Sequence, residues 1–230
     1  MNVSVSYYSE CGIRNNNEDS VSIVKLPDGI LAIVADGLGG YDNGEIASSK
    51  AVRILSQYAR SKQMDADGLA QAICEANDLI FSENTKMKTT IAVLLLRDTE
   101  CVALHVGDSR IYQIRNGEII FQSLDHSVAQ LAVLVGELSA DELRSHPDQH
   151  RLVRALGGPR TPKIAIDTLE TQSGDYFLLC SDGFWEPVTE NMMIESLAEH
   201  NGVEDWLAVM KKTAQAYSKD NHSAIAIKIN

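Results

Sequence analysis

The chain has 230 residues, of which 44% are hydrophobic, which is enough for a substantial core in one large domain or two small ones. Its net charge is -12, from 32 acidic and 20 basic residues, and the lysines and arginines form no cluster that could follow a phosphate backbone. This composition argues against nucleic acids and anionic membrane surfaces as partners.

The first ten residues have neither a basic start nor a long apolar run. The longest uninterrupted apolar stretch, residues 91–96, is far too short to cross a bilayer. The four cysteines are widely spaced and form no C-x-x-C pair, so buried free thiols are the default interpretation. We expect a cytoplasmic protein.

The N-terminal part predicts strands followed by helices. Alternating polar and apolar residues indicate a strand at 3–7, and residues 20–25 and 30–35 predict a hairpin. Apolar residues then recur at helical spacing over 44–61 and over 66–83. We interpret both apolar stripes as faces packed on the core.

The middle of the chain is rich in predicted strands. Residues 89–96, 101–107, 110–114 and 118–122 read as a meander, with a turn of the Asn-Gly type at 115–117. This part of the chain should form sheet.

Residues 128–151 have a different character. A short apolar helix is followed by a break at Gly136, an acidic helix at 140–144 and a polar stretch at 146–150. We interpret this segment as a mobile surface excursion.

Strands return at 163–169 and 176–180, two helices are predicted at 190–200 and 203–218, and a last strand at 223–229. The second of these helices carries four side chains that we expect on one face: Trp206, Met210, Thr213 and Tyr217.

This order of elements favours two packed sheets with helices outside. No linker, repeat or low-complexity segment divides the chain. We therefore expect a single domain spanning residues 1–230.

Three of the apolar runs end on an aspartate beside a glycine, at Asp36, Asp108 and Asp182. A single Asp-Gly pair is more often a turn, because both residues tolerate a positive φ. Three such pairs after strands too apolar to be solvated favour a shared function instead. Clustered carboxylates are costly unless cations neutralise them, so the pattern points to a divalent-metal centre.

Other catalytic motifs are missing from the sequence. It contains no P-loop, no His-Glu-x-x-His and no cysteine with an arginine six residues later, and the third glycine of a dinucleotide fingerprint is replaced by Asp42. The oxygen donors that remain, joined by Asp220 and by Glu18-Asp19, suit Mg²⁺ or Mn²⁺ better than Zn²⁺. Two such ions about 3.5–4 Å apart can share a hydroxide, and Asp36 is the candidate bridging ligand.

Seven short motifs occur in a characteristic order. They are Arg14-x-x-Asn17-Glu18-Asp19, Val34-Ala35-Asp36-Gly37-Leu38-Gly39-Gly40, Val106-Gly107-Asp108-Ser109-Arg110, Asp125-His126-Ser127, Arg154-Ala155-Leu156-Gly157, Cys180-Ser181-Asp182-Gly183 and Asp220-Asn221. In these motifs the chain resembles the metal-dependent protein phosphatases of type 2C, over essentially its whole length and close to their minimal bacterial form.

The resemblance implies an α+β fold, a four-layer α/β/β/α sandwich of two antiparallel sheets flanked by helices. It implies a flap subdomain at about 127–150 next to the active site, which would shape substrate choice. It also implies hydrolysis of phosphoserine and phosphothreonine on proteins, by direct attack of a hydroxide bridging two divalent metals and without a covalent enzyme intermediate.

The resemblance further assigns the metal ligands. Asp36 matches the ligand that bridges the two metals, and the Gly37 carbonyl would bind the first. Asp182 and Asp220 would complete the second. Asp108 matches the family's ligand to a third, weaker metal, which it would share with Asp182.

Four more positions follow from the same motifs. Glu18 matches the residue that holds metal-bound water, and Asp19 and Asn221 match residues that support the ligands. Arg14 matches the arginine that binds phosphate, for which a guanidinium is suited by its parallel donors.

Two positions depart from the family pattern. Leu38 stands where many eukaryotic members have a histidine thought to protonate the leaving group, so another donor, such as a metal-bound water, is expected. Lys88 replaces the glycine of a Gly-Thr-Thr motif, which puts the local backbone geometry in question.

The remaining polar candidates are interpreted as structural. We expect His126 to hold a loop by hydrogen bonding and His105 to be a satisfied residue of the sheet. Arg110 and Arg154 should form salt bridges with acidic partners rather than bind phosphate.

The resulting hypothesis is a monomeric Mg²⁺- or Mn²⁺-dependent phosphatase with two core ions, to which a third can be added, acting on targets of a cognate Ser/Thr kinase. A catalytically dead member serving as a binding module is the rival, although every expected carboxylate is present. A two-metal nuclease would need a basic track, which the sequence lacks.

Overall fold

The computed structural model describes the whole chain except residues 39–42, 62–64, 84–85 and 201. Within the described residues the strands form two five-stranded sheets in which every pairing is antiparallel. The first sheet has the order β1 (Val3–Glu10), β10 (His222–Ile229), β9 (Tyr176–Cys180), β6 (Arg110–Arg115) and β7 (Glu118–Gln122). The second has the order β2 (Asp19–Leu26), β3 (Gly29–Asp36), β4 (Ile91–Arg97), β5 (Cys101–Val106) and β8 (Ala165–Thr168).

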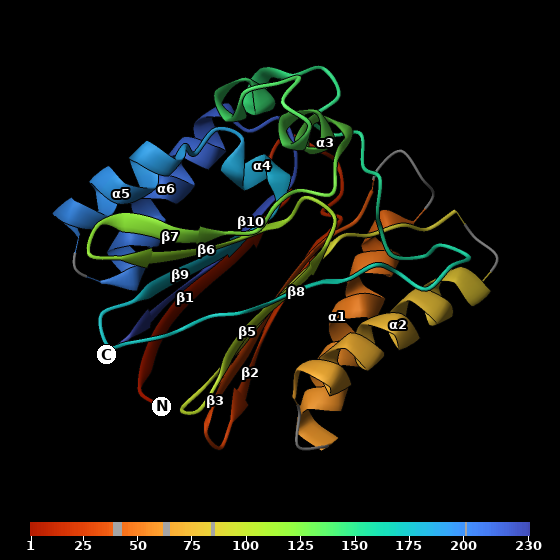
Figure 1. The fold of residues 1–230 in the computed structure, drawn as a ribbon, viewed down its shortest axis with the longest axis horizontal. Coiled ribbons are helices and arrows are strands. Elements are labelled where there is room, and N and C mark those ends of the chain that lie inside the picture. The colour runs from red at the N-terminus through yellow and green to blue at the C-terminus, as the bar shows by residue number, and fades with distance from the viewer. Residues whose placement is uncertain (39–42, 62–64, 84–85, 201) are drawn as a thin grey trace.

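The helices cover the outer faces of both sheets (Figure 1). On the second sheet lie α1 (Gly44–Ser61) and α2 (Ala66–Ser82). On the first lie α4 (Asp182–Trp185), α5 (Glu190–Glu199) and α6 (Val203–Tyr217). This is the predicted four-layer sandwich, an α+β fold with the helices outside.

The burial pattern of the central strands explains their apolar sequences. In β3, Leu31 and Ile33 pack against the helices, whereas Ala32 and Val34 face the other sheet. Because successive side chains of a strand point to opposite faces, a strand covered on both sides needs apolar residues throughout. The side chains of β3 therefore alternate between the core under the helices and the core between the two sheets.

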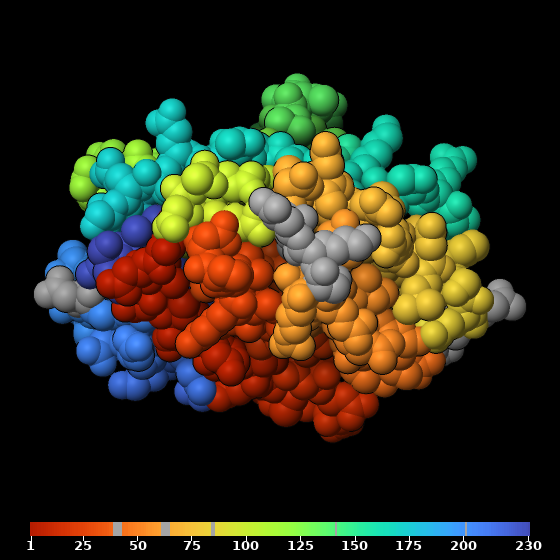
Figure 2. Space-filling view, turned by 90° about the horizontal axis from the view of Figure 1, so that it is seen from below, coloured from red at the N-terminus to blue at the C-terminus, as the bar shows by residue number. Residues whose placement is uncertain are grey.

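The lower end of the molecule is closed by hairpin turns. Figure 2 shows the ends of the β2–β3 and β4–β5 hairpins side by side on this face, next to the N-terminal strand. The opposite, upper end in Figure 1 carries the C-terminal end of β3 and the start of α4. Of the helices in the described residues, none is long and apolar enough to cross a membrane.

Residues 127–150 form α3 (Val128–Leu134) and η1 (Ala140–Ser145) above the upper end of the sheets (Figure 1). The acidic helix expected here is a 3₁₀ helix, which begins with a capping box between Ser139 and Glu142. That this segment acts as a mobile flap stays a prediction.

Two features of the helices go beyond the sequence expectations. The four-residue helix α4 was not predicted, because a helix this short shows no hydrophobic period. Of the four side chains expected on one face of α6, Trp206 and Met210 are buried, whereas Tyr217, the last residue of that helix, is 73% exposed.

Candidate active site

An open cleft of about 1460 Å³ lies at the upper end of the sandwich. All six predicted metal ligands line it: Glu18, Asp36, Gly37, Asp108, Asp182 and Asp220. Arg14 and Asn221 line it as well. Two of the carboxylates follow strands of the second sheet and two flank strands of the first, so the cleft gathers charge from both sheets.

Asp36 is held by the backbone and side chains of the Thr89-Thr90 pair. Its N–H donates to Thr90 Oγ1 at 3.0 Å, and its carbonyl oxygen accepts from Thr90 N at 2.8 Å and from Thr89 Oγ1 at 2.9 Å. Burial raises the pKa of Asp36 well above its ordinary value, and the nearby carboxylates of Asp182, Asp19 and Asp108 raise it further. This cluster of carboxylates therefore favours bound cations or protons.

Gly37 lies where no larger residue fits. Its N–H donates to the Glu18 carbonyl oxygen at 3.1 Å, and a Cβ at this position would collide with the backbone of Gly44 at the start of α1. Glu18 is thereby held beside Asp36. Burial raises the pKa of Glu18, and the charges of Glu45 and Asp220 act in the same direction.

Asn221 ties the loop before β2 to the start of β10. Its Oδ1 accepts from the N–H of Glu18 at 2.8 Å, and its Nδ2 donates to the carbonyl oxygens of Cys11 at 2.9 Å and Asn16 at 2.8 Å. The loop fixed in this way also carries Arg14, whose Nη2 lies 2.6 Å from Asp220 Oδ2. The predicted phosphate-binding residue and a predicted metal ligand thus form an ion pair.

Asp19 lies behind the cleft rather than in it. Its Oδ2 accepts from Ser181 Oγ at 2.7 Å, and Ser181 Oγ in turn accepts from Ser223 N at 3.0 Å. Among the described residues, its buried Oδ1 has no hydrogen-bond partner. Burial raises the pKa of Asp19 to about 7, with the charges of Asp182 and Asp220 adding to the shift.

The short helix α4 brings Asp108 and Asp182 together. Trp185 Nε1 donates to the Asp108 carbonyl oxygen at 2.9 Å, which fixes the end of β5 against α4. A Cβ at Gly183 would collide with the Asn221 carbonyl oxygen, so the first turn of α4 also packs closely on the start of β10. Burial, then the charge of Asp182, raises the pKa of Asp108 well above its ordinary value.

His150 and Glu186 are two site residues that the sequence reasoning missed. His150 Nδ1 lies 3.3 Å from Asp182 Oδ2, and its Nε2 lies 3.0 Å from Glu186 Oε1. The contact with Asp182 raises the pKa of His150 to about 9. Burial raises the pKa of Glu186 to about 7. Asp182 and Glu186 are four residues apart, so a helix at this position would have predicted that their side chains lie on the same face.

Arg110 forms the salt bridge that was predicted for it. Its Nε and Nη2 donate to the two carboxylate oxygens of Asp125 at 2.8 and 2.7 Å, in the bidentate geometry that arginine favours. The guanidinium also stacks on the Trp185 ring, 3.5 Å from its centroid. Arg110 is buried and packs β6 against α4 through its contact with Trp185.

The same prediction is wrong for Arg154. In the described part of the chain it forms no ion pair; its Nη1 lies 3.1 Å from His126 Nε2, and it lines the cleft. His126 holds a loop as predicted, since its Nδ1 accepts from Gly107 N at 3.2 Å. Burial lowers the pKa of His126 to about 3, so the imidazole beside Arg154 is neutral.

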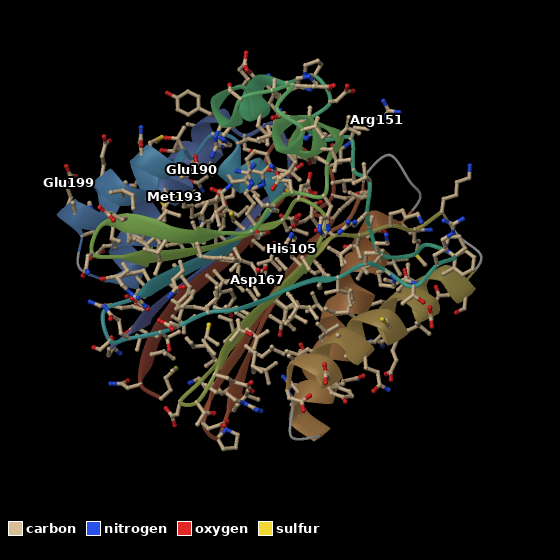
Figure 3. All side chains as sticks on the ribbon, viewed as in Figure 1. His105, Arg151, Asp167, Glu190, Met193 and Glu199 are labelled. Atoms are coloured by element: carbon tan, nitrogen blue, oxygen red, sulfur yellow. The ribbon has the colours of Figure 1, made fainter. Side chains whose placement is uncertain are left out.

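His105 is a buried residue of β5, as expected (Figure 3). Its Nε2 lies 2.8 Å from the Leu124 carbonyl oxygen, and its ring stacks on that of His126 with centroids 4.6 Å apart. The pair of rings packs the end of β5 against the loop after β7. Burial lowers the pKa of His105.

Lys88 leaves the backbone beside Asp36 in regular geometry. The Leu38 N–H donates to the Lys88 carbonyl oxygen at 3.1 Å, and Thr89 pairs with Leu156 through both backbone groups. The Lys88 Nζ donates to the Gly157 carbonyl oxygen at 2.7 Å. The side chain thus points along the cleft wall, and burial lowers its pKa.

A cleft lined with oxygen donors and arginines, between the ends of two packed sheets, is typical of a metal-dependent phosphohydrolase. A family model described as protein phosphatase 2C matches residues 13–225. The chain belongs to the protein phosphatase 2C family.

Relatives support the same assignment. The serine/threonine phosphatase stp of Listeria monocytogenes serotype 4b is 30% identical to the chain, over 94% of this chain and 90% of that protein. Among solved structures, the PPM Ser-Thr phosphatase MsPP from Mycobacterium smegmatis, in complex with cacodylate, superposes with a TM-score of 0.87 at 31% identity, over 99% of this chain and 98% of that one. The protein is a serine/threonine protein phosphatase that acts on phosphoproteins.

A further solved structure bears on the metal. The catalytic domain of the serine threonine protein phosphatase PstP, in complex with two manganese ions, has a TM-score of 0.83 at 27% identity and covers 98% of this chain and 97% of that one. Together with the family assignment, it supports dependence on divalent cations.

Proposed function

We propose that the chain hydrolyses phosphoserine and phosphothreonine with two Mg²⁺ or Mn²⁺ ions held in the cleft. The observation that carries this proposal is the convergence of Asp36, Asp108, Asp182 and Asp220 beside Arg14. The donor set fits such ions because it consists of oxygens, and because burial and neighbouring carboxylates raise the pKa of Asp36 and Asp108. One chain supplies every proposed ligand, which is consistent with a monomer.

The ligand roles that we propose are the ones implied by the sequence motifs. Asp36 would hold both ions, the Gly37 carbonyl the first, and Asp182 and Asp220 the second. Asp108 and Asp182 would hold a third, weaker ion. When bound, the cations supply an activated water nucleophile and neutralise charge that develops on the phosphate.

The other side chains position these groups and the substrate. Glu18 would orient water in the cleft, and Asp19 and Asn221 hold the surrounding loops. Arg14 donates to the phosphate oxygens. Its ion pair with Asp220 uses one of five N–H donors, so the guanidinium can bind phosphate from the same place.

The apolar Leu38 lines the cleft beside Gly37 and offers no proton. The leaving Ser/Thr oxygen must therefore take its proton from water in the cleft or from another residue there. This distinguishes the chain from members that carry a histidine at this position.

The four cysteines are free, as is usual for proteins of a reducing compartment. This supports a cytoplasmic site of action, where the enzyme would oppose a cognate Ser/Thr kinase.

Two substitutions test the ligand roles. We expect Asp36→Asn to abolish both the binding of two cations and turnover, by at least about a thousandfold, because it removes the bridging ligand. Asp108→Asn should lower turnover while leaving most of the two-cation binding intact. Calorimetric titration with Mn²⁺ and phosphate release from a phosphothreonine peptide measure the two effects.

Asp205→Asn, on the exposed face of α6, removes the same charge away from the cleft and serves as the control. Phosphate release that survives exhaustive chelation with EDTA would refute the metal-dependent mechanism. An Asp182→Asn variant with full activity would instead show that the ligand assignment is wrong.

A further inference from the structure

One wall of the cleft carries positive charge that no acidic side chain pairs with in the described part of the chain. Arg151, Arg160 and Lys163 line the cleft and are exposed, and among the described residues they form no ion pair. We call these three residues the basic wall. In Figure 3 Arg151 lies at the edge of the molecule beside α3, on the side of α1 and α2.

The basic wall is unusual for this molecule. The chain has a net charge of -12, so its overall field repels acidic partners. The positive charge is confined to the basic wall, because the same cleft also contains the carboxylates of the proposed metal ligands. Arg154 lies there too, beside a neutral His126 rather than an acid, and adds to the positive charge.

The segment that carries Arg160 is fixed by a buried residue of α2. Asn77, only 1% exposed, accepts from the N–H groups of Gly157 at 3.0 Å and Gly158 at 3.1 Å, and donates to the carbonyl oxygens of Gly158 at 3.1 Å and Arg160 at 3.4 Å. Gly157 has a φ of +90°, and a Cβ there would collide with the Met87 carbonyl oxygen. The backbone at Arg160 is therefore held in place before any substrate arrives, which lowers the entropy lost on binding.

The cleft also has room for more than a phosphorylated side chain. Its volume of about 1460 Å³ exceeds the roughly 300–1,000 Å³ of a typical small-molecule site. Leu131, 48% exposed, and Val153, 45% exposed, add apolar surface to its rim. A peptide segment on both sides of the phosphorylated residue would contact the basic wall and this rim.

We propose that the enzyme prefers phosphorylated segments with acidic residues flanking the phosphoserine or phosphothreonine, and that the basic wall selects them. This inference rests on the proposed function of the cleft. Charges at a rim act mainly on encounter and orientation, so the preference should depend on ionic strength.

The test uses two phosphothreonine peptides of equal length with Mn²⁺. One has Asp and Glu on both sides of the phosphothreonine, and the other has Asn and Gln at the same positions. We expect a kcat/KM about tenfold higher for the acidic peptide at low salt, shrinking towards equality at about 0.5 M salt. The double variant Arg160→Glu/Lys163→Glu should lower the ratio to about one or less.

Lys25→Glu is the matched control, because it reverses an exposed charge near the lower end of β2. It should leave the ratio between the peptides unchanged. The neutral variant Arg160→Gln/Lys163→Gln should give an intermediate ratio, and thermal unfolding confirms that each variant is folded. Equal rates for the two peptides with the native chain, or a ratio unaffected by the double variants, would overturn the inference. Failure to hydrolyse either peptide would contradict the proposed function instead.

Discussion

The imidazole of His126 is buried, and burial disfavours its protonated, charged form. It is 9% exposed, accepts from Gly107 N and lies against the Arg154 guanidinium, so protonation would break a hydrogen bond and place two cations together. Its pKa is about 3 in the folded protein and about 6.5 in an unfolded chain. Between these values the unfolded state binds more protons than the folded state.

His126 should therefore contribute a loss of stability as the pH falls below about 6.5, of up to about 1.4 kcal/mol per pH unit, against which the buried carboxylates of the cleft act in the opposite direction. His126→Asn should reduce this slope, because the Asn carbonyl can accept from Gly107 N and does not titrate. Urea unfolding at a series of pH values in EDTA measures the free energy of unfolding. Above about pH 8 the two proteins should show parallel curves, and equal slopes below pH 6.5 would contradict the role given to His126.

At the residue scale, site residues could be predicted from the sequence where they directly follow a recognisable strand. Asp36, Asp108 and Asp182 could be found because each ends an apolar run. His150 could not, because its place beside Asp182 depends on how the segment after η1 folds back onto α4. Arg154 was misassigned for the same reason, since no local pattern shows that its neighbour is a neutral histidine.

At the level of elements, the loop from Cys11 to Glu18 depends on one amide. Asn221→Ala would leave three backbone groups of this loop without their partner. We expect a loss of about 2 kcal/mol in the free energy of unfolding, since water can replace part of these hydrogen bonds. We also expect weaker cation binding, because Glu18 is carried by the same loop.

Chemical denaturation and calorimetric titration with Mn²⁺ measure the two effects. Asn191→Ala, on the exposed side of α5, is the matched control and should change neither. Unaltered cation affinity in Asn221→Ala would show that the loop does not need this tether.

The elements themselves were largely predictable, because a period of two or of 3.6 residues is a local property of the sequence. The order of strands within each sheet was not. β10 lies between β1 and β9, and β8 returns to pair with β5, through contacts between residues far apart in the chain. The four-layer arrangement was predicted from the resemblance to a known family, whereas the individual helices and strands were predicted from periodicity alone.

For the molecule as a whole, the clustered carboxylates lower the free energy of unfolding when no cation is bound, and the same cluster provides the cation site. Without cations, burial and the charges of neighbouring carboxylates raise the pKa of Asp36, Asp19 and Asp108, which is a cost to the folded state. Asp36→Asn should therefore raise the melting temperature in EDTA. In the native chain, Mn²⁺ at about 100 times its Kd should add about 2.7 kcal/mol of stability.

Differential scanning calorimetry with and without Mn²⁺ measures both effects, and Asp36→Asn should lose most of the stabilisation by Mn²⁺. Asp205→Asn should keep the full Mn²⁺ response. A native chain with the same melting temperature in EDTA and in Mn²⁺ would contradict the proposed cation site.

The central place of β10 in the first sheet has a consequence for synthesis on the ribosome. β1 and β9 cannot be joined until His222–Ile229 emerges, and Asp220 and Asn221 come immediately before that strand. A nascent chain that lacks this stretch has neither a closed sheet nor a tethered Arg14 loop. The enzyme should therefore acquire activity only after β10 has been synthesised, so that shorter nascent chains do not dephosphorylate cellular proteins.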